Sequence, residues 1–223
     1  MFNILKILFM GTIKKGILGG FSGKVGTVVG ASWKGIDYIR SLPTTVRNPR
    51  TKGQVSQRTK FSVTMDFLKP LTPVIRMGFK ADASGKITAM NAAMSYNLMN
   101  AITGEFPDLV IDYERAVIAR GSLYGSDSAA ASAAAGEVAF DWDLVAANDA
   151  GMNDSVVLVA YNADKKDCVY NDSLGKRMEG YGSLAVPAIW AGDTVHTYIF
   201  FISEDGKRNS NSIYTGSVEV VLA

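Results

Sequence analysis

Two short hydrophobic runs near the N-terminus have the composition of β-strands. Residues 24–32 and 36–42 are rich in β-branched and aromatic residues, and the segment between them contains Gly35. This pattern predicts a β-hairpin with Gly35 in its turn. Gly26 and Gly30 interrupt the first strand with positions that lack a side chain, so they permit close approach by another backbone.

Helical periodicity follows in residues 51–107. Thr51 is a candidate N-cap, and the apolar residues after it recur at helical spacing until Pro70. Residues 87–102 repeat this pattern, which ends before Pro107. We assign both apolar stripes to core packing, including the methionines of the second. The stripes consist of Val55, Phe61, Met65 and Leu68, and of Ile87, Met90, Met94, Leu98 and Ile102.

From residue 108 onward the hydrophobic pattern becomes that of β-strands. Turn sequences such as 148–151 and 205–206 separate the hydrophobic segments. The Ala/Ser tract at 128–135 is small and polar, which predicts a loop, with a helical turn as the alternative. Short strands at this spacing indicate an antiparallel Ig-like β-sandwich that is expected to fold alone. The predicted strands are 109–121, 136–144, 154–163, 166–172, 194–203 and 212–222.

These patterns predict an α+β protein of three regions. Residues 1–50 form a basic, glycine-rich hairpin followed by an extended arm, and residues 51–107 form a helical segment. Residues 108–223 form a sandwich that resembles an immunoglobulin or fibronectin type III module. The chain of 223 residues is 48% hydrophobic and 20% charged, which is ordinary for a globular protein with a sizeable core.

The charge is distributed unevenly along the chain. Residues 1–60 contain 11 lysines and arginines and one acidic residue, whereas residues 108–223 contain 8 and 17. The basic head suits either a polyanionic partner or the acidic tail of another copy. Cations interleaved with aromatic residues can also bind a phosphate backbone. The candidate interaction residues are Lys24, Trp33, Lys34, Tyr38, Arg40, Arg47, Arg50 and Arg58.

The sequence offers few residues for catalysis. Cys168 and His196 are the only cysteine and histidine, so a Cys–His pair requires these two residues to meet. The glycine-rich stretch lacks the spacing of a P-loop and of a dinucleotide motif. Asp141 and Asp143 alternate with apolar neighbours, which is typical of the solvent face of a strand. We therefore expect no enzymatic activity, no cofactor and no metal site.

The first nine residues, MFNILKILF, do not have the features of a signal peptide. Their apolar run is short, Lys6 interrupts it, and no small-residue cleavage site follows. They are either a short apolar addition or an extension upstream of a start at Met10. No segment has the length of a membrane span, so we expect a cytoplasmic or virion location.

Two motifs carry a family resemblance. One is GxxGxVGxxxGxxWKGxxxIRSxP with NPRTxxQxxQRxxF, from Gly20 to Phe61, and the other is YIFFISEDGKRNSNSIYTGSVEV near the C-terminus. Together they resemble a large bacterial family known only as a domain of unknown function, over the chain from Met10 to its end. The NPRT element also resembles short proteins of phage-like structural gene regions. The resemblance implies no catalytic residue.

Three hypotheses about function follow. The first is a non-enzymatic, phage-related structural or assembly protein that self-associates through its basic N-terminal hairpin, with further copies or another structural protein as partner. The alternative is a nucleic-acid-binding protein that uses the same basic region. A third, an adhesive surface module, is less favoured because no signal sequence is recognised.

Overall fold

The computed structural model describes residues 11–13, 19–33, 35–43, 45, 48, 50–83, 87–144, 150–171 and 175–221. The chain divides into two compact units, Met1–Arg50 and Thr51–Ala223. This division coincides with the boundary that the sequence predicts between the basic head and the helical segment. The predictions for residues 1–9, and for most of the arm at 44–49, fall outside the described residues.

The first unit is an antiparallel sheet with its strands in sequence order, β1-β2-β3-β4. These strands are β1 (Thr12–Ile13), β2 (Phe21–Val25), β3 (Val28–Trp33) and β4 (Ile36–Ser41). The predicted hairpin is present as β3 and β4, with Gly35 in the turn at a φ of 85°. The predicted first strand is wrong at Gly26, which has a φ of 57° and lies in a turn between β2 and β3. Glycine adopts this left-handed conformation readily, so the chain reverses there.

Three helices begin the second unit: α1 (Lys52–Leu68), α2 (Thr72–Gly78) and α3 (Ala89–Asn100). Two of them match the predicted helices, and α2 is an additional one. Thr51 caps α1 as predicted, since its hydroxyl oxygen accepts a hydrogen bond from the Gln54 amide at 3.4 Å. Thr88 caps α3 in the same way, with the Asn91 amide at 3.2 Å.

The predicted apolar stripes of these helices are right only in part. Helix α1 buries Thr64, Phe67 and Leu68 but leaves Phe61 50% exposed. Helix α3 buries Met94, whereas Ile87 is exposed before the helix begins. Packing therefore occurs along part of each stripe, because only part of each helix lies against the rest of the unit.

The second unit contains two main sheets. Its strands are β5 (Ile102–Thr103), β6 (Val110–Ile111), β7 (Ala129–Ala134), β8 (Glu137–Trp142), β9 (Ser155–Asn162), β10 (Asp167–Tyr170), β11 (Gly175–Lys176), β12 (Tyr181–Ala185), β13 (Thr194–Ile202) and β14 (Ile213–Glu219), with 3-10 turns at Arg177–Glu179 and Ala188–Trp190. One sheet has the order β10-β9-β13-β14, with β11 also paired to β9, and the other has the order β12-β8-β7. This distribution of strands defines an Ig- or fibronectin-III-like sandwich.

Two strand predictions are wrong. Residues 109–121 form only β6, a two-residue strand paired with β5, and then run as turns and irregular chain. The Ala/Ser tract at 128–135, predicted as a loop, is largely β7 and pairs with β8 along its whole length. Ala129 and Ala131 pack against the sandwich core, so small side chains suffice where the neighbouring strands supply the bulk.

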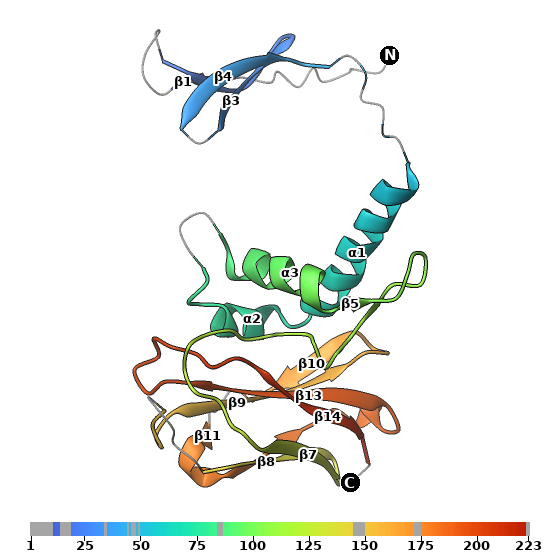
Figure 1. The fold of residues 1–223 in the computed structure, drawn as a ribbon, viewed down its shortest axis with the longest axis vertical. Coiled ribbons are helices and arrows are strands. Elements are labelled where there is room, and N and C mark those ends of the chain that lie inside the picture. The colour runs from blue at the N-terminus through green and yellow to red at the C-terminus, as the bar shows by residue number, and fades with distance from the viewer. Residues whose placement is uncertain are drawn as a thin grey trace, which may run out of the picture. The chain divides into compact units, whose positions relative to one another are not determined.

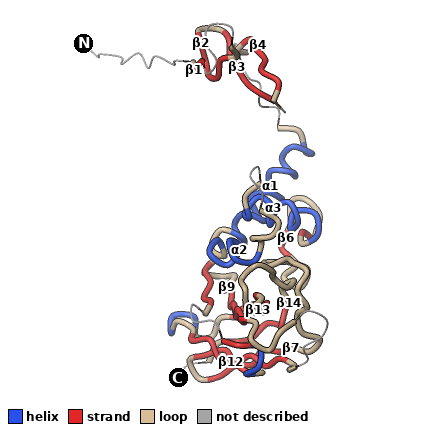
Figure 2. The backbone as a smooth tube through the Cα atoms, turned by 90° about the vertical axis from the view of Figure 1, so that its left-hand side faces the viewer, coloured by secondary structure: helices blue, strands red, loops and turns tan. Residues whose placement is uncertain are grey.

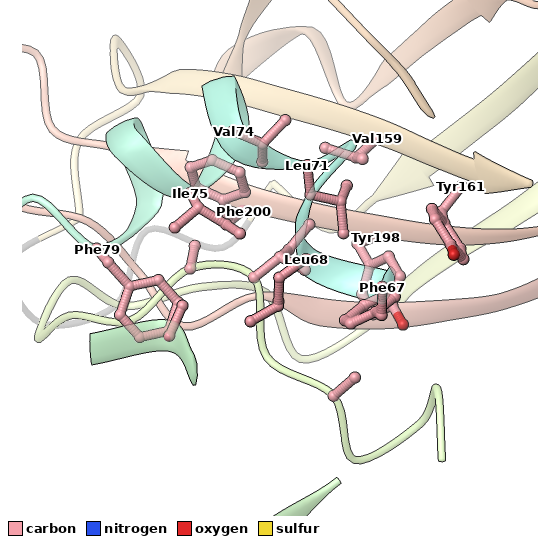
Figure 3. Close-up of a cluster of buried hydrophobic side chains, with 14 of the residues drawn as sticks. Phe67, Leu68, Leu71, Val74, Ile75, Phe79, Val159, Tyr161, Tyr198 and Phe200 are labelled. Atoms are coloured by element: carbon pink, nitrogen blue, oxygen red, sulfur yellow. The ribbon is translucent and has the colours of Figure 1, made fainter. Parts of the chain in front are cut away.

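The β10-β9-β13-β14 sheet is buried on both faces. Its inner face packs on the second sheet through Val156, Leu158, Ile199 and Phe201, against residues such as Phe140 and Trp142. Its outer face is covered by the helices, which lie on the same side of the sheet in both views (Figures 1 and 2). Figure 3 shows side chains of the helical segment packed over this face of the sheet. The residues from the sheet are Val159, Tyr161, Tyr198 and Phe200, and those from the helical segment are Phe67, Leu68, Leu71, Val74, Ile75 and Phe79.

The core between the helices and the sheet spans the predicted domain boundary between residues 107 and 108. The helices and the outer face of the sheet share one continuous cluster of buried side chains. The boundary therefore runs through a single core, and residues 51–223 form one compact unit.

Candidate interaction surfaces

The strand register separates the side chains of the N-terminal sheet onto two faces. Directly opposed residues on neighbouring strands share a face, and successive residues along a strand alternate. Lys24 lies opposite Val29, which lies opposite Arg40. Trp33 lies opposite Ile36 in the same alternation. We call this side the cationic face, formed by Lys24, Val29, Trp33, Ile36, Tyr38 and Arg40.

The other side of the sheet also carries apolar side chains, beside the polar Ser32 and Asp37. It carries Phe21, Val25 and Val28 together with Ile39, which lies opposite Gly30. A Cβ at Gly30 would lie 2.0 Å from the carbonyl oxygen of Phe21, so the close backbone approach predicted for this glycine is confirmed. The approach occurs inside the sheet, between β2 and β3.

The sheet lacks a core of its own among the described residues. Of those at positions 11–50, Gly30 alone is buried. Large apolar side chains are instead exposed on both faces, with Trp33 at 63%, Ile36 at 66% and Ile39 at 64%. A small sheet that leaves this much apolar surface in water is not expected to be stable without a cover.

Strand β4 is the long edge of this sheet. It pairs with β3 through all six of its residues, and β3 is its one neighbour in the part of the chain that the structure describes. Each side chain of β4 is exposed. An exposed edge of this length presents backbone N–H and C=O groups to which another strand can pair.

The structure brings together four of the eight predicted interaction residues. Lys24, Trp33, Tyr38 and Arg40 share the cationic face. Arg50 ends the first unit, and Arg58 lies on α1 in the second, so neither belongs to the sheet. Lys34 and Arg47 lie outside the described residues.

The sequence analysis did not identify Ile36 and Ile39 as interaction residues, although each is exposed, on opposite faces of this sheet. The signal was present in β4, where IDYIRS places apolar residues at both odd and even positions. A strand with one buried face alternates apolar and polar residues, so the absence of alternation indicates two faces that both need cover.

Cys168 and His196 do not form a pair. Both lie opposite Tyr161, Cys168 from β10 and His196 from β13, so β9 separates them by roughly 10 Å, the width of two strand spacings. Burial raises the pKa of the Cys168 thiol to about 12. The thiol donates to the Pro70 carbonyl at 3.2 Å and packs at the margin of the helical core.

The FDWD segment has the orientation that its alternation predicts. Phe140 and Trp142 are buried between the sheets, and Asp141 is exposed. Asp143 accepts a hydrogen bond from the Ser126 hydroxyl. The Trp142 indole donates to the carbonyl oxygen of Arg177 at 2.8 Å.

Arg177 is the most unusual charged residue of the sandwich. Its side chain is fully buried, with Nε 3.6 Å from Oδ2 of Asp154, which is itself 4% exposed. The guanidinium donates to the carbonyl oxygens of Tyr124 and Gly125 and lies 3.8 Å above the ring of Phe201. Burial lowers the pKa of Arg177, and Asp154 opposes this shift. These contacts tie a loop and a 3-10 turn to the sandwich and indicate a structural role.

His196 belongs to a cluster of aromatic side chains. Its ring stacks on Tyr113 with centroids 3.7 Å apart, and its Nδ1 lies 3.0 Å from the Tyr214 hydroxyl. Burial lowers the pKa of His196. The neutral imidazole is therefore the form that the folded protein favours.

The folded protein is expected to lose stability as the pH falls below about 6.5, the usual pKa of histidine. Below that pH the unfolded chain binds a proton at His196 that the folded chain resists, so stability rises with pH across this range. His196→Gln should flatten the dependence below about pH 6.5, measured by urea unfolding. If His196→Gln leaves the pH dependence of stability unchanged, other titratable groups cause that dependence.

Two further properties concern the described residues. No group of three or more His, Cys, Asp or Glu side chains suited to a metal ion occurs among them. None of the helices described is long and apolar enough to span a membrane.

The fold defines the class of this protein as an α+β chain with an Ig- or fibronectin-III-like sandwich, a helical layer and a separate basic sheet. Residues 20–216 match the family described as "Family of unknown function (DUF6266)". The chain belongs to this family, which confirms the resemblance to a family without an assigned function.

Comparison with curated proteins and with solved structures assigns no function to the chain. No curated protein matches the chain. The crystal structure of the chicken CNTN1 FN1-FN3 domains is similar with a TM-score of 0.37 and 8% identity, over 46% of this chain and 34% of that one. The chain thus spans about a third of that structure's length. The strand order described above, rather than this similarity, defines the sandwich.

Proposed function

We propose that this protein is a non-enzymatic structural or assembly protein that self-associates through its N-terminal sheet. One observation carries the proposal: the sheet has a fully exposed edge strand and apolar side chains on both faces, with only Gly30 buried among its described residues. Such a sheet requires a cover, and a second copy supplies both a strand for the edge and an apolar face.

The charge distribution supports self-association. The unit Met1–Arg50 contains eight lysines and arginines and one acidic residue, whereas Thr51–Ala223 contains 15 and 20. The basic unit of one copy is therefore attracted to the acidic unit of another. The phage-related part of the proposal rests on the resemblance of residues 48–58 to proteins of phage-like structural gene regions.

Sedimentation velocity of the full chain tests this proposal. The wild-type protein should form assemblies that grow with concentration in the micromolar range. The double variant Ile36→Lys/Ile39→Lys should lose them, because lysines on an edge strand oppose pairing with another chain. Ile189→Lys is the matched control, since Ile189 is 74% exposed and lies in the other unit.

Two outcomes would contradict the proposal. One is a wild-type chain that stays monomeric at all concentrations, which would mean that the sheet is covered within its own chain. The other is an equal effect of the edge and control variants. Raising the salt concentration distinguishes charge attraction from strand pairing and apolar burial, since salt weakens only the charge attraction.

The second candidate function is binding of nucleic acid. The register places Lys24 and Arg40 on the same face as Trp33 and Tyr38, which is the combination of cations and aromatic platforms used for single strands. Binding by this face should weaken steeply with salt and with Lys24→Glu/Arg40→Glu. Tight binding of a single-stranded oligonucleotide at physiological salt would favour nucleic-acid binding over self-association as the function.

A further inference from the structure

The N-terminal part of α1 presents a side-chain face to solvent. Residues 52–62 contain no buried side chain, and this part of the helix extends beyond the helical layer in both views (Figures 1 and 2). A shallow, mostly apolar hollow runs along it. The residues that line this hollow are Gln57, Arg58, Phe61, Ser62, Met65 and Asp66, which we call the α1 face.

The α1 face has an unusual symmetry. Its residues recur at intervals of four along the helix, so they form two adjacent rows on one side. Small Ser62 lies at the centre, beside half-exposed Phe61. Arg58 and Asp66 lie four residues before and after Ser62, each about 6 Å along the axis from it. Arg58 and Asp66 thus flank the centre formed by Ser62 and Phe61, a cation on one side and an anion on the other.

We propose that the α1 face pairs with the α1 face of a second copy, in an antiparallel arrangement about a two-fold axis near Ser62. A two-fold contact requires a patch that is complementary to itself. In this arrangement Arg58 of each copy lies opposite Asp66 of the other, and the two Phe61 rings cover the centre. A uniformly basic face would suit a polyanion, whereas this face carries both charges and suits its own copy.

Asp66 remains available for this contact. It forms an ion pair with Lys166 at 2.7 Å, and its side chain is 53% exposed. A carboxylate accepts several hydrogen bonds, so it can receive a second cation. One helix pair buries less surface than a stable dimer usually requires, so the contact alone is weak.

This inference goes beyond the proposed function because it concerns a different surface. A chain with a two-fold contact on α1 and a pairing edge on β4 has two distinct ways to bind its own kind. The first contact closes a dimer, and the second links dimers into larger assemblies. Two weak contacts in one assembly strengthen each other through effective concentration.

Cysteine cross-linking in the full chain tests the α1 contact. Ser62→Cys places a thiol at the two-fold axis, within reach of a bismaleimide that spans about 8–10 Å, the separation of packed helices. Gly53→Cys is the control, because position 53 is exposed, has open space for a side chain, and lies two and a half turns away on the other side of α1. The unaltered chain, whose one thiol is half-buried Cys168, is the blank.

We expect a cross-linked dimer from Ser62→Cys and only background from the control and the blank. Adding Arg58→Asp should lower the yield about tenfold, since two exposed ion pairs become repulsive. Adding Asp66→Arg together with Lys166→Glu to that variant should restore the yield, because the charges between the copies are then exchanged and the ion pair at position 66 is kept. Nucleic-acid binding or a structural role of Arg58 would not give this restoration.

Equal cross-linking of Ser62→Cys and Gly53→Cys, or none from either, would overturn the inference. So would a charge exchange that fails to restore the yield. These outcomes are distinct from failure of the proposed function. If the β4 edge does not pair, Ser62→Cys still cross-links, and if the α1 face does not pair, the edge-dependent assemblies persist in the wild-type chain.

Discussion

Replacing Arg177 by methionine is expected to lower the free energy of unfolding by about 3–5 kcal/mol. The substitution leaves the Asp154 carboxylate buried without its cation, 3.6 Å from where Nε lies in the wild type. It also removes the donors that satisfy the carbonyl oxygens of Tyr124 and Gly125. Unpaired charges and acceptors in a dry interior lose their hydration without compensation.

Urea unfolding of Arg177→Met and of Arg177→Met/Asp154→Asn measures this effect. The double variant should be more stable than the single one, because the uncompensated carboxylate is gone while the Asn side chain can still accept from Gly151 or Glu204 amides. Lys207→Met is the control, since its ion pair with Asp205 is exposed and should contribute little to stability. Equal losses in Arg177→Met and Lys207→Met would refute the structural role of Arg177.

A chain of residues 108–223 is expected to aggregate or remain unfolded, although the sequence pattern alone favours an independent sandwich. Without residues 51–107 the outer face of the β10-β9-β13-β14 sheet is exposed. That face includes Val157, Val159, Tyr161, Tyr198 and Phe200, each nearly or fully buried in the complete protein. Burial of one such side chain contributes about 1.5–3 kcal/mol, so their joint exposure is comparable with the usual total stability of about 5–15 kcal/mol.

The matched chain for this experiment is residues 51–223, which retains the helices and both cores. It should unfold in one cooperative transition, followed by circular dichroism and urea titration. A chain of residues 108–223 with a similarly sharp transition would show that the helices are dispensable for folding. Such a result would restore the predicted boundary at residues 107 and 108.

Local patterns in the sequence determined several elements correctly. Thr51 caps α1, and the run at 154–163 forms β9, because caps and long β-branched runs act through near neighbours. The turn at Gly35 follows from the same local chemistry. The alternation of FDWD likewise predicted which side chains of β8 are buried.

The tertiary structure alone decided which surfaces meet. The Ala/Ser tract became a strand because β8 offered a partner for pairing, which no property of small residues predicts. Phe61 fits the apolar stripe of its helix but is exposed, because the helices cover the sheet only along the last part of α1. Arg177 gave no signal in the sequence, since its burial depends on loops that are distant along the chain.

The candidate interaction surface likewise depends in part on the sequence alone and in part on the tertiary structure. The sequence by itself determined that the head is basic, aromatic and rich in glycine. Only the strand register decided that Lys24, Trp33, Tyr38 and Arg40 share a face while Arg50 and Arg58 lie outside the sheet. The physical reason is that composition is a sum over residues, whereas a surface depends on pairing between strands, and a shift of one residue moves each side chain to the opposite face.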